Sequence, residues 1–176
     1  ISDKMPVIEM SIGTFSGFTV TEGQSYNAGG IRATGNVLIK NCIISGNATI
    51  ENQDANIQIY PFAYGGGVYL TDNAIMENCI VAENWSWFGA GGVLMDENAI
   101  IRDCVVDKNR TKGLGGGILV YSGNCTIERV DFKRNRCLGQ SMGGPADPSF
   151  GGGLGVRSGT VTVNNSLLWK NNAMSG

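Results

Sequence analysis

A repeated pattern is the feature that most restricts how this chain of 176 residues can fold. Five segments open with two glycines and an aliphatic residue, and each closes with an apolar residue, two further residues and an asparagine. Intervals of 37, 25, 26 and 36 residues separate the closing asparagines, which are Asn47, Asn84, Asn109, Asn135 and Asn171. The basic period is therefore about 25 residues, which is typical of a solenoid of stacked repeats.

Within each repeat, apolar residues recur at every second position, which predicts β-strands rather than helices. One apolar column, counted back from the asparagine, holds Val20, Ile44, Val81, Val106, Phe132 and Leu168. Two others hold Phe18, Cys42, Cys79, Cys104, Val130 and Ser166, and Phe15, Ile39, Met76, Ile101, Ile127 and Val163. A fourth, after the glycines, holds Ile31, Val68, Val93, Ile118 and Leu154.

Short strands that recur in register cannot each bury a face alone, so they are expected to stack. We therefore predict an all-β chain, a single-stranded right-handed parallel β-helix (solenoid) of about six coils, with residues 1–176 as one segment. The exposed column Lys40, Glu77, Arg102 and Glu128 alternates in sign, as stacked neighbours prefer, and this supports the register.

Composition excludes several classes of protein. The chain has no histidine, which removes histidine-based triads and most catalytic zinc sites. A net charge of −2 argues against a nucleic-acid partner, and no apolar run is long enough for a transmembrane segment. The five cysteines contain no CxxC pair, so we expect no metal site and no cofactor.

The Gly-Gly-aliphatic opening and the apolar-x-x-Asn closing resemble the short repeats of polymorphic outer membrane proteins and related bacterial surface β-helices. Phe132-Lys133-Arg134-Asn135 matches their FxxN form, whereas the other repeats carry Ile44, Val81, Val106 or Leu168 in place of phenylalanine. The resemblance covers about residues 29–176. It implies a secreted or cell-surface bacterial protein, often an adhesin. Pectate-lyase-like enzymes share the coil, so the resemblance specifies architecture rather than activity.

The repeated glycines and asparagines have structural interpretations. We expect each Gly-Gly pair to supply a positive φ at a tight corner rather than a phosphate loop, because neither a helix start nor a lysine follows. We expect the closing asparagines to form a hydrogen-bonded ladder along the axis. Asn47, Asn84 and Asn109 also begin glycosylation sequons, but the ladder explains their regular spacing without glycans.

Two loop insertions, residues 48–65 and 136–151, follow a closing asparagine and precede the next Gly-Gly. Since both leave the coil at the same corner, they are expected to wall a cleft over the two short turns between them. Aromatic rings and cations in such a cleft suit a glycan or a host cell-surface protein. The candidate ligand-binding residues are Trp85, Trp87, Phe88, Tyr60, Tyr64, Arg110 and Lys112. Packing of these aromatic rings beneath their own loops is the alternative.

A polysaccharide lyase or glycoside hydrolase is an alternative function, because such β-helix enzymes use clustered carboxylates with a basic residue. The candidate acids are Asp96, Asp103 and Asp107, with Lys133 or Arg110 as the base. However, no two aspartates fall in one outward column of adjacent coils, which argues against a paired-acid hydrolase and a calcium-dependent lyase. The stacked Cys42, Cys79 and Cys104 are interpreted as core rather than as a metal or redox site.

A structural spacer or assembly module is the third possibility. The column Tyr69, Leu94 and Leu119 is expected to form an exposed apolar stripe that supports side-by-side or end-to-end self-association. No capping helix is visible at either end, and solenoid ends need covering. We therefore expect the chain to be a piece of a longer protein, or its ends to be covered by other chains.

Overall fold

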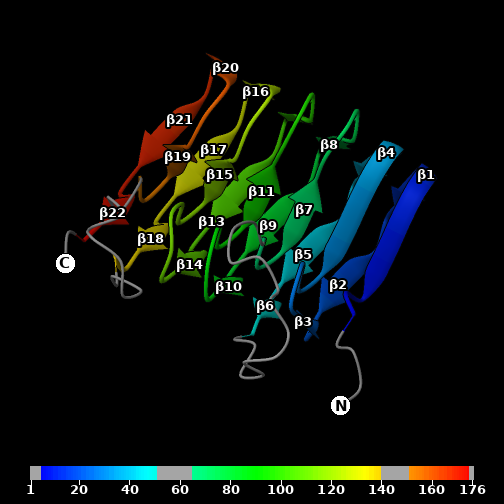
Figure 1. Cartoon of the computed structure of the whole chain (residues 1–176), viewed down its shortest axis with the longest axis horizontal. Helices are drawn as coiled ribbons and strands as arrows, with labels where there is room; N and C mark the ends of the chain where they lie inside the picture. The colour runs from blue at the N-terminus through cyan, green and yellow to red at the C-terminus, as the bar shows by residue number, and fades with distance from the viewer. Residues whose placement is uncertain (1–4, 51–64, 140–150, 175–176) are drawn as a thin grey trace.

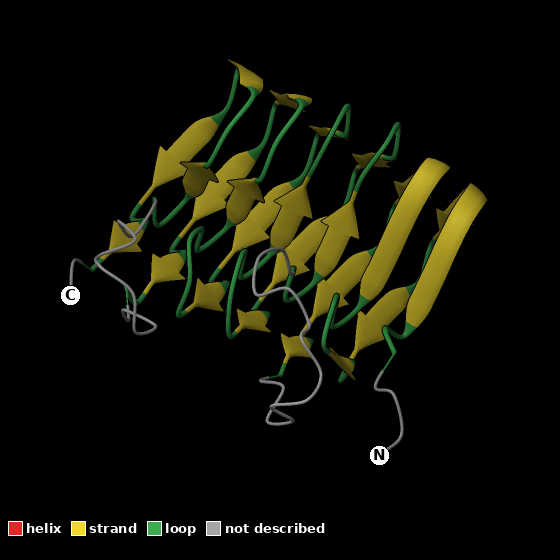
Figure 2. Ribbon diagram, viewed as in Figure 1, coloured by secondary structure: helices red, strands yellow, loops and turns green. Residues whose placement is uncertain are grey.

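The computed structural model describes residues 5–50, 65–139 and 151–174, and these residues form a stack of short parallel strands (Figure 1, Figure 2). The chain runs repeatedly through three sheets, which we call A, B and C. Each passage adds one strand to sheet B and one to sheet C, and from β7 onward each passage adds two strands to sheet A. Every pairing between the described strands is parallel. The predicted all-β parallel β-helix is therefore confirmed in its architecture.

Sheet A has ten strands, arranged with β4 at its centre. They are β1 (Ile8–Ser16), β4 (Ile31–Lys40), β7 (Val68–Leu70), β8 (Ile75–Glu77), β11 (Val93–Met95), β12 (Ile100–Arg102), β15 (Ile118–Val120), β16 (Asn124–Glu128), β19 (Leu154–Val156) and β20 (Thr160–Asn164). Long β1 and β4 run through a position where later coils make a turn, so β7 and β8 both pair with β4.

Sheets B and C each have six strands among the described residues. Sheet B consists of β2 (Thr19–Thr21), β5 (Ile43–Ser45), β9 (Ile80–Ala82), β13 (Val105–Asp107), β17 (Asp131–Lys133) and β21 (Leu167–Trp169). Sheet C consists of β3 (Gln24–Ser25), β6 (Ala48–Thr49), β10 (Trp85–Ser86), β14 (Arg110–Thr111), β18 (Arg136–Cys137) and β22 (Asn172–Ala173).

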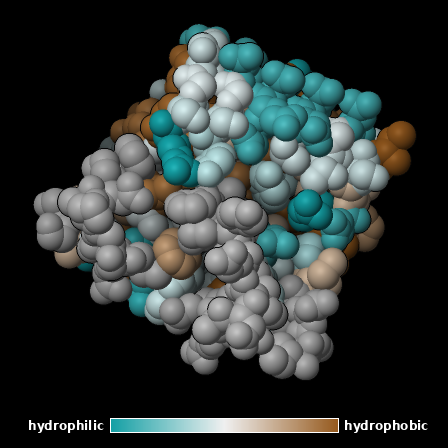
Figure 3. All heavy atoms as spheres, viewed as in Figure 1, coloured by the Kyte–Doolittle hydropathy of each residue, from teal (hydrophilic) through white to brown (hydrophobic). Residues whose placement is uncertain are grey.

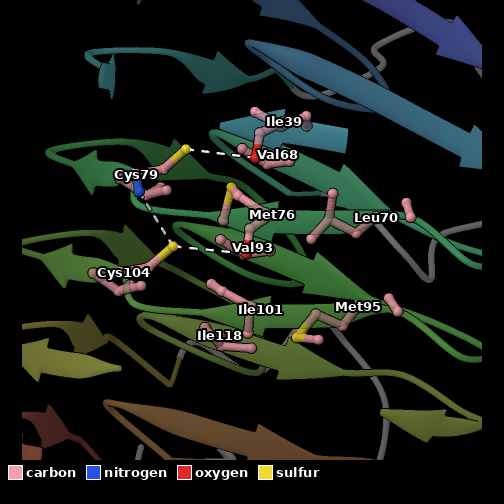
Figure 4. Close-up of a cluster of buried hydrophobic side chains, with 14 of the residues drawn as sticks. Ile39, Val68, Leu70, Met76, Cys79, Val93, Met95, Ile101, Cys104 and Ile118 are labelled. Atoms are coloured by element: carbon pink, nitrogen blue, oxygen red, sulfur yellow. Dashed lines mark hydrogen bonds between the residues drawn. The ribbon is translucent and has the colours of Figure 1, made fainter. Parts of the chain in front are cut away.

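The predicted apolar columns are confirmed as register partners in the core. Val81 pairs with Val106 and Val106 with Phe132, and all three side chains are buried. The columns through Met76 and Val93 stack in the same way (Figure 4). The members of these columns on the first and last coils are exposed: Phe18 is 57% exposed and Leu168 is 53% exposed. Among the described residues, no further coil lies against them.

The closing asparagines hydrogen-bond from coil to coil inside the structure. The backbone N–H and Nδ2 of Asn84 donate to Oδ1 of Asn109 at 3.0 Å, and Asn109 donates in the same way to Asn135. Each Nδ2 also donates to a core carbonyl, as Asn109 does to Val81 at 2.9 Å. Asn84 and Asn109 are buried, so these amides satisfy backbone groups that water cannot reach. The same bonds occupy the nitrogen that a sequon glycan would need.

The physical reason predicted for the Gly-Gly pairs is wrong. None of these glycines has a positive φ. They are needed because the coils approach too closely for a side chain: a Cβ on Gly91 would lie 2.4 Å from the carbonyl of Gly116, and one on Gly92 would lie 2.7 Å from that of Gly117. The left-handed corners are instead occupied mostly by larger residues in two columns, such as Asn41, Asn78, Asp103, Arg129 and Asn165, and Glu22, Glu83, Lys108, Arg134 and Lys170.

The expected exposed apolar stripe is also wrong. Leu94 and Leu119 point away from the main core, but both are 0% exposed. They form a second apolar cluster with Ala90, and Leu114 and Tyr69 pack against it. Leu114 comes from the turn between β14 and β15, so that turn folds over the outer face of sheet A. This surface is consequently part of the folded chain and is not available for assembly.

Most of the two insertions, residues 51–64 and 140–150, lies outside the described residues, and so do Tyr60 and Tyr64. The described beginnings of both insertions are strands of sheet C, β6 and β18. Within the described ranges, the chain contains no helix with the length and apolar character required to cross a membrane.

Gly92→Ala should destabilise the fold, because the new Cβ would meet the Gly117 carbonyl and the Asn109 side chain. We expect the free energy of unfolding to fall by about 1–3 kcal/mol. Gly46→Asn is the matched control: Gly46 has φ 66° at a corner that tolerates side chains in other coils, and the nearest atom to its Cβ is 3.4 Å away. Urea unfolding of both variants measures the difference, and equal losses would contradict the steric explanation.

Asn109→Ala should destabilise the protein more strongly than removal of an exposed asparagine. The substitution leaves the N–H of Asn84 and the carbonyl of Val81 without their buried partners. Each unsatisfied group costs about 1–3 kcal/mol. Asn98→Ala, at an exposed turn position, is the control and should change stability little. Thermal unfolding followed by circular dichroism compares them, and a stable Asn109→Ala protein would show that the ladder contributes little.

Candidate functional site

The outer face of sheet C carries a column of large polar and aromatic side chains. Trp85, Arg110 and Arg136 each follow a closing asparagine directly, and they are register partners on β10, β14 and β18. The next residue of each strand, Ser86, Thr111 or Cys137, is buried. Because side chains alternate along a strand, the preceding residue must face outward.

Buried hydroxyl and thiol groups hold this alternation in place. Thr111 Oγ1 donates to the carbonyl of Gly89 at 3.1 Å, and Cys137 Sγ donates to the carbonyl of Gly113 at 2.8 Å. Thr49 Oγ1 lies 2.9 Å from Ser86 Oγ and accepts the backbone N–H of Trp87 at 3.1 Å. The turns that follow sheet C are therefore anchored to its inner face, and the outer face is a rigid platform.

A second column lies beside the first. The backbone N–H of Lys112 donates to the carbonyl of Ser86, so Lys112 follows β14 as Trp87 follows β10. The Lys112 Nζ lies 3.4 Å from the centroid of the Trp87 ring, a cation–π contact. Nε1 of Trp87 is buried and has no hydrogen-bond partner among the described residues. We call Trp85, Trp87, Arg110, Lys112 and Arg136 the sheet C patch.

Of the predicted ligand-binding residues, the structure brings Trp85, Trp87, Arg110 and Lys112 onto one face. Phe88 adjoins Trp87 and is half-buried, and its carbonyl accepts a hydrogen bond from Ser86. Arg136 was missed by the sequence reasoning, although a signal was present. It follows Asn135 just as Arg110 follows Asn109, so extending the column by one coil would have found it.

The acids proposed for an enzyme lie on different segments and are already engaged. Asp103 accepts two bonds from the Arg129 guanidinium, at 2.5 and 2.8 Å, and these hold its pKa below the usual range. Asp107 is a register partner of Lys133 but pairs with Arg134, at 2.9 Å from Nε. Lys133 itself lies 2.7 Å from Asp131, and Asp96 accepts from Ser122 and from the N–H of Glu97.

A stacked carboxyl pair, Asp72 and Glu97, was not expected. The turns after β7 and β11 place these residues at equivalent corners, where Asn98 N–H donates to the Asp72 carbonyl. Hydrogen bonding and repulsion from Asp72 raise the pKa of Glu97. Hydrophilic residues gather along the upper edge of the molecule, where these turns lie (Figure 3). In the sequence we looked for two aspartates in one column and therefore did not find a pair made of an aspartate and a glutamate.

The stacked cysteines form hydrogen bonds with one another and with backbone carbonyls. The N–H of Cys42 donates to Sγ of Cys79 at 3.4 Å. The N–H of Cys79 donates in the same way to Sγ of Cys104, also at 3.4 Å (Figure 4). The Cys79 and Cys104 thiols each donate to the carbonyl two residues earlier at 3.1 Å. Burial raises the pKa of Cys42 and raises that of Cys125 to about 11. These two thiols therefore stay protonated at neutral pH and behave as packing groups.

A family model described as a right handed beta helix region matches residues 5–174, nearly the whole chain. No curated protein and no solved structure matches the chain. The family description agrees with the parallel stacking of the three sheets, and it concerns architecture rather than activity.

The two shifted carboxyl groups should give opposite pH dependences. Because the folded pKa of Glu97 is raised, its contribution to stability is complete below its ordinary pKa of about 4.3 and is lost as the pH rises through the folded pKa. Because the folded pKa of Asp103 is lowered, its contribution is present above its ordinary pKa of about 3.9 and is lost as the pH falls through the folded pKa.

We therefore expect Glu97→Gln to gain stability relative to the unsubstituted protein as the pH rises above about 4. Asp103→Asn should be the less stable protein at neutral pH, and its deficit should shrink toward acid pH. Urea unfolding between about pH 3 and pH 7 measures both trends. Parallel pH profiles for the two variants would contradict the assignment of the shifts.

Proposed function

The chain belongs to the right-handed β-helix family, and on that premise we propose that it is a non-catalytic segment that binds a glycan through the sheet C patch. Adhesion is the biological role that fits such a segment. We further propose that it acts in a secreted or cell-surface bacterial protein, because its repeats resemble those of polymorphic outer membrane proteins.

The juxtaposition of two indole rings and three cations carries the proposal. Trp85 offers a partly exposed indole ring, and Trp87 adds a second ring that carries the Lys112 ammonium on one face. Arg110 and Arg136 are exposed donors on neighbouring strands. Sugars are bound by stacking of their apolar faces on aromatic rings together with hydrogen bonds from a few polar groups. Strands joined on both sides hold these groups rigidly, so a ligand meets a preformed surface.

The ion pairs that Asp103 and Asp107 form with arginines support a non-catalytic role. A general acid or base needs a carboxyl group that is free to exchange a proton with substrate. Asp103 and Asp107 are each bound by a guanidinium group with two contacts, so proton exchange would first require these ion pairs to break.

A polysaccharide lyase or glycoside hydrolase is the second candidate, and the Asp72–Glu97 pair is the observation that favours it. Two neighbouring carboxyl groups, one with a raised pKa, match the requirements of acid–base chemistry on a glycosidic bond. Sustained turnover of a polysaccharide, abolished in Glu97→Gln, would establish this alternative. The spacer alternative lost its proposed assembly surface when Leu94 and Leu119 proved to be buried.

Binding on a glycan array should depend on the indole rings of the patch. We expect Trp85→Ala and Trp87→Ala each to weaken binding about tenfold, because each removes a stacking surface for a sugar ring. Trp169→Ala is the matched control, since Trp169 is 45% exposed on sheet B, away from the patch. Isothermal titration with the best array ligand quantifies the losses. Binding that is indifferent to Trp85 and Trp87 would remove the site.

A further inference from the structure

We propose that the sheet C patch is specific for anionic glycans, whose carboxylate or sulfate groups are bound by Arg110 and Arg136. This inference rests on the proposed function and names the ligand class of the same site. It follows from the one place, among the charged register partners of the described strands, where two like charges are paired.

Charged register partners on the described strands have opposite signs at almost every place. They are Glu9 with Arg32, Lys40 with Glu77, Glu77 with Arg102, Arg102 with Glu128, and Asp107 with Lys133. Arg110 and Arg136 are the exception among these strands, because they are register partners with the same charge. Like charges directly opposite each other destabilise a sheet, so this pair has a cost that the rest of the fold avoids.

No acidic side chain among the described residues forms an ion pair with Arg110 or Arg136. The Arg136 guanidinium donates a hydrogen bond to the Met174 sulfur at 2.9 Å. Their column continues with Trp85 on one side and Asn172 on the other, neither of which is acidic. Both arginines are exposed, and a ligand can therefore supply the missing negative charge.

The spacing of the column fits a sugar acid. Neighbouring strands lie about 4.8 Å apart, so two guanidinium groups on adjacent strands can bracket one carboxylate or sulfate group. Guanidinium groups bind such oxygens in paired, planar contacts, and this favours arginine over lysine at the site. Trp85 occupies the next strand, where it can stack on the ring that carries the acid or on its neighbour. The combination of a ring platform beside two cations favours an acidic glycan over an acidic peptide.

A single chemical series tests the proposal. Chondroitin sulfate oligosaccharides carry carboxylates and sulfates, their desulfated form carries carboxylates alone, and the desulfated, carboxyl-reduced form is neutral. Isothermal titration of all three separates the contribution of each anion. We expect one or both charged forms to bind at least about tenfold more tightly than the neutral form, with an affinity that falls as salt rises from about 0.05 to 0.2 M.

Arg110→Gln and Arg136→Gln should each weaken binding of the charged form about tenfold, and the double variant should lose most of the salt dependence. Arg157→Gln, which removes an arginine from above Tyr121, is the control for net charge and should bind normally. A second readout uses no ligand: either patch variant should unfold at the same temperature or higher at low salt, because the repulsion between the guanidinium groups is removed.

The remaining outcomes have distinct meanings. Equal binding of neutral and charged chains would overturn charge selectivity and leave the proposed glycan-binding function intact. Binding of none of the glycans on the array or in this series would overturn both. Binding of polyglutamate through Arg110 and Arg136, without any glycan, would show that the patch recognises acidic protein instead and would overturn the ligand class.

Discussion

The hydrogen-bonded stacking of each residue on the equivalent residue of the next coil is the interaction on which this structure depends. Backbone bonds within the three sheets provide it along the strands, and the asparagine ladder provides it at the corner between sheets B and C. Each closing asparagine accepts a hydrogen bond from a backbone N–H of the preceding coil and donates one to a carbonyl of that same coil, as Asn109 does with Asn84 and Val81. An error in register at one coil would therefore leave several buried polar groups without partners.

Stacking also turns single residues into columns. A glycine in the Gly-Gly pair is required by the carbonyl of the coil beside it, and a charge is stabilised or destabilised by the charge in the same position one coil away. In most columns the neighbours are compatible, as the alternation of Lys40, Glu77, Arg102 and Glu128 shows. Columns that break this rule are the informative ones, since they retain a cost within the chain. The Arg110–Arg136 pair is such a place among the register partners of the described strands, and the Asp72–Glu97 pair is one at a corner between strands.

The candidate site was partly visible in the sequence. Trp85 and Arg110 could be placed on one face because both follow a closing asparagine, and the register bears out that they are neighbours. Arg136 has the same position, but attention to the turns between the two insertions excluded it. Which partner each carboxylate chooses could not be predicted, because Asp107 has Lys133 as its register partner and yet pairs with Arg134. Side-chain reach across a corner decides that choice, and repeat spacing carries no information about it.

The repeat by itself determined the strands, their parallel stacking and the inward columns, because a period of about 25 residues with alternating apolar positions leaves few other ways to bury them. Only the tertiary structure decided why the glycines are needed and which outward residues are covered. Gly92 has no room for a Cβ because the next coil approaches it, and Leu94 is buried in a cluster against which Leu114, from a turn of the next coil, packs. Both depend on distances between coils, which periodicity does not encode.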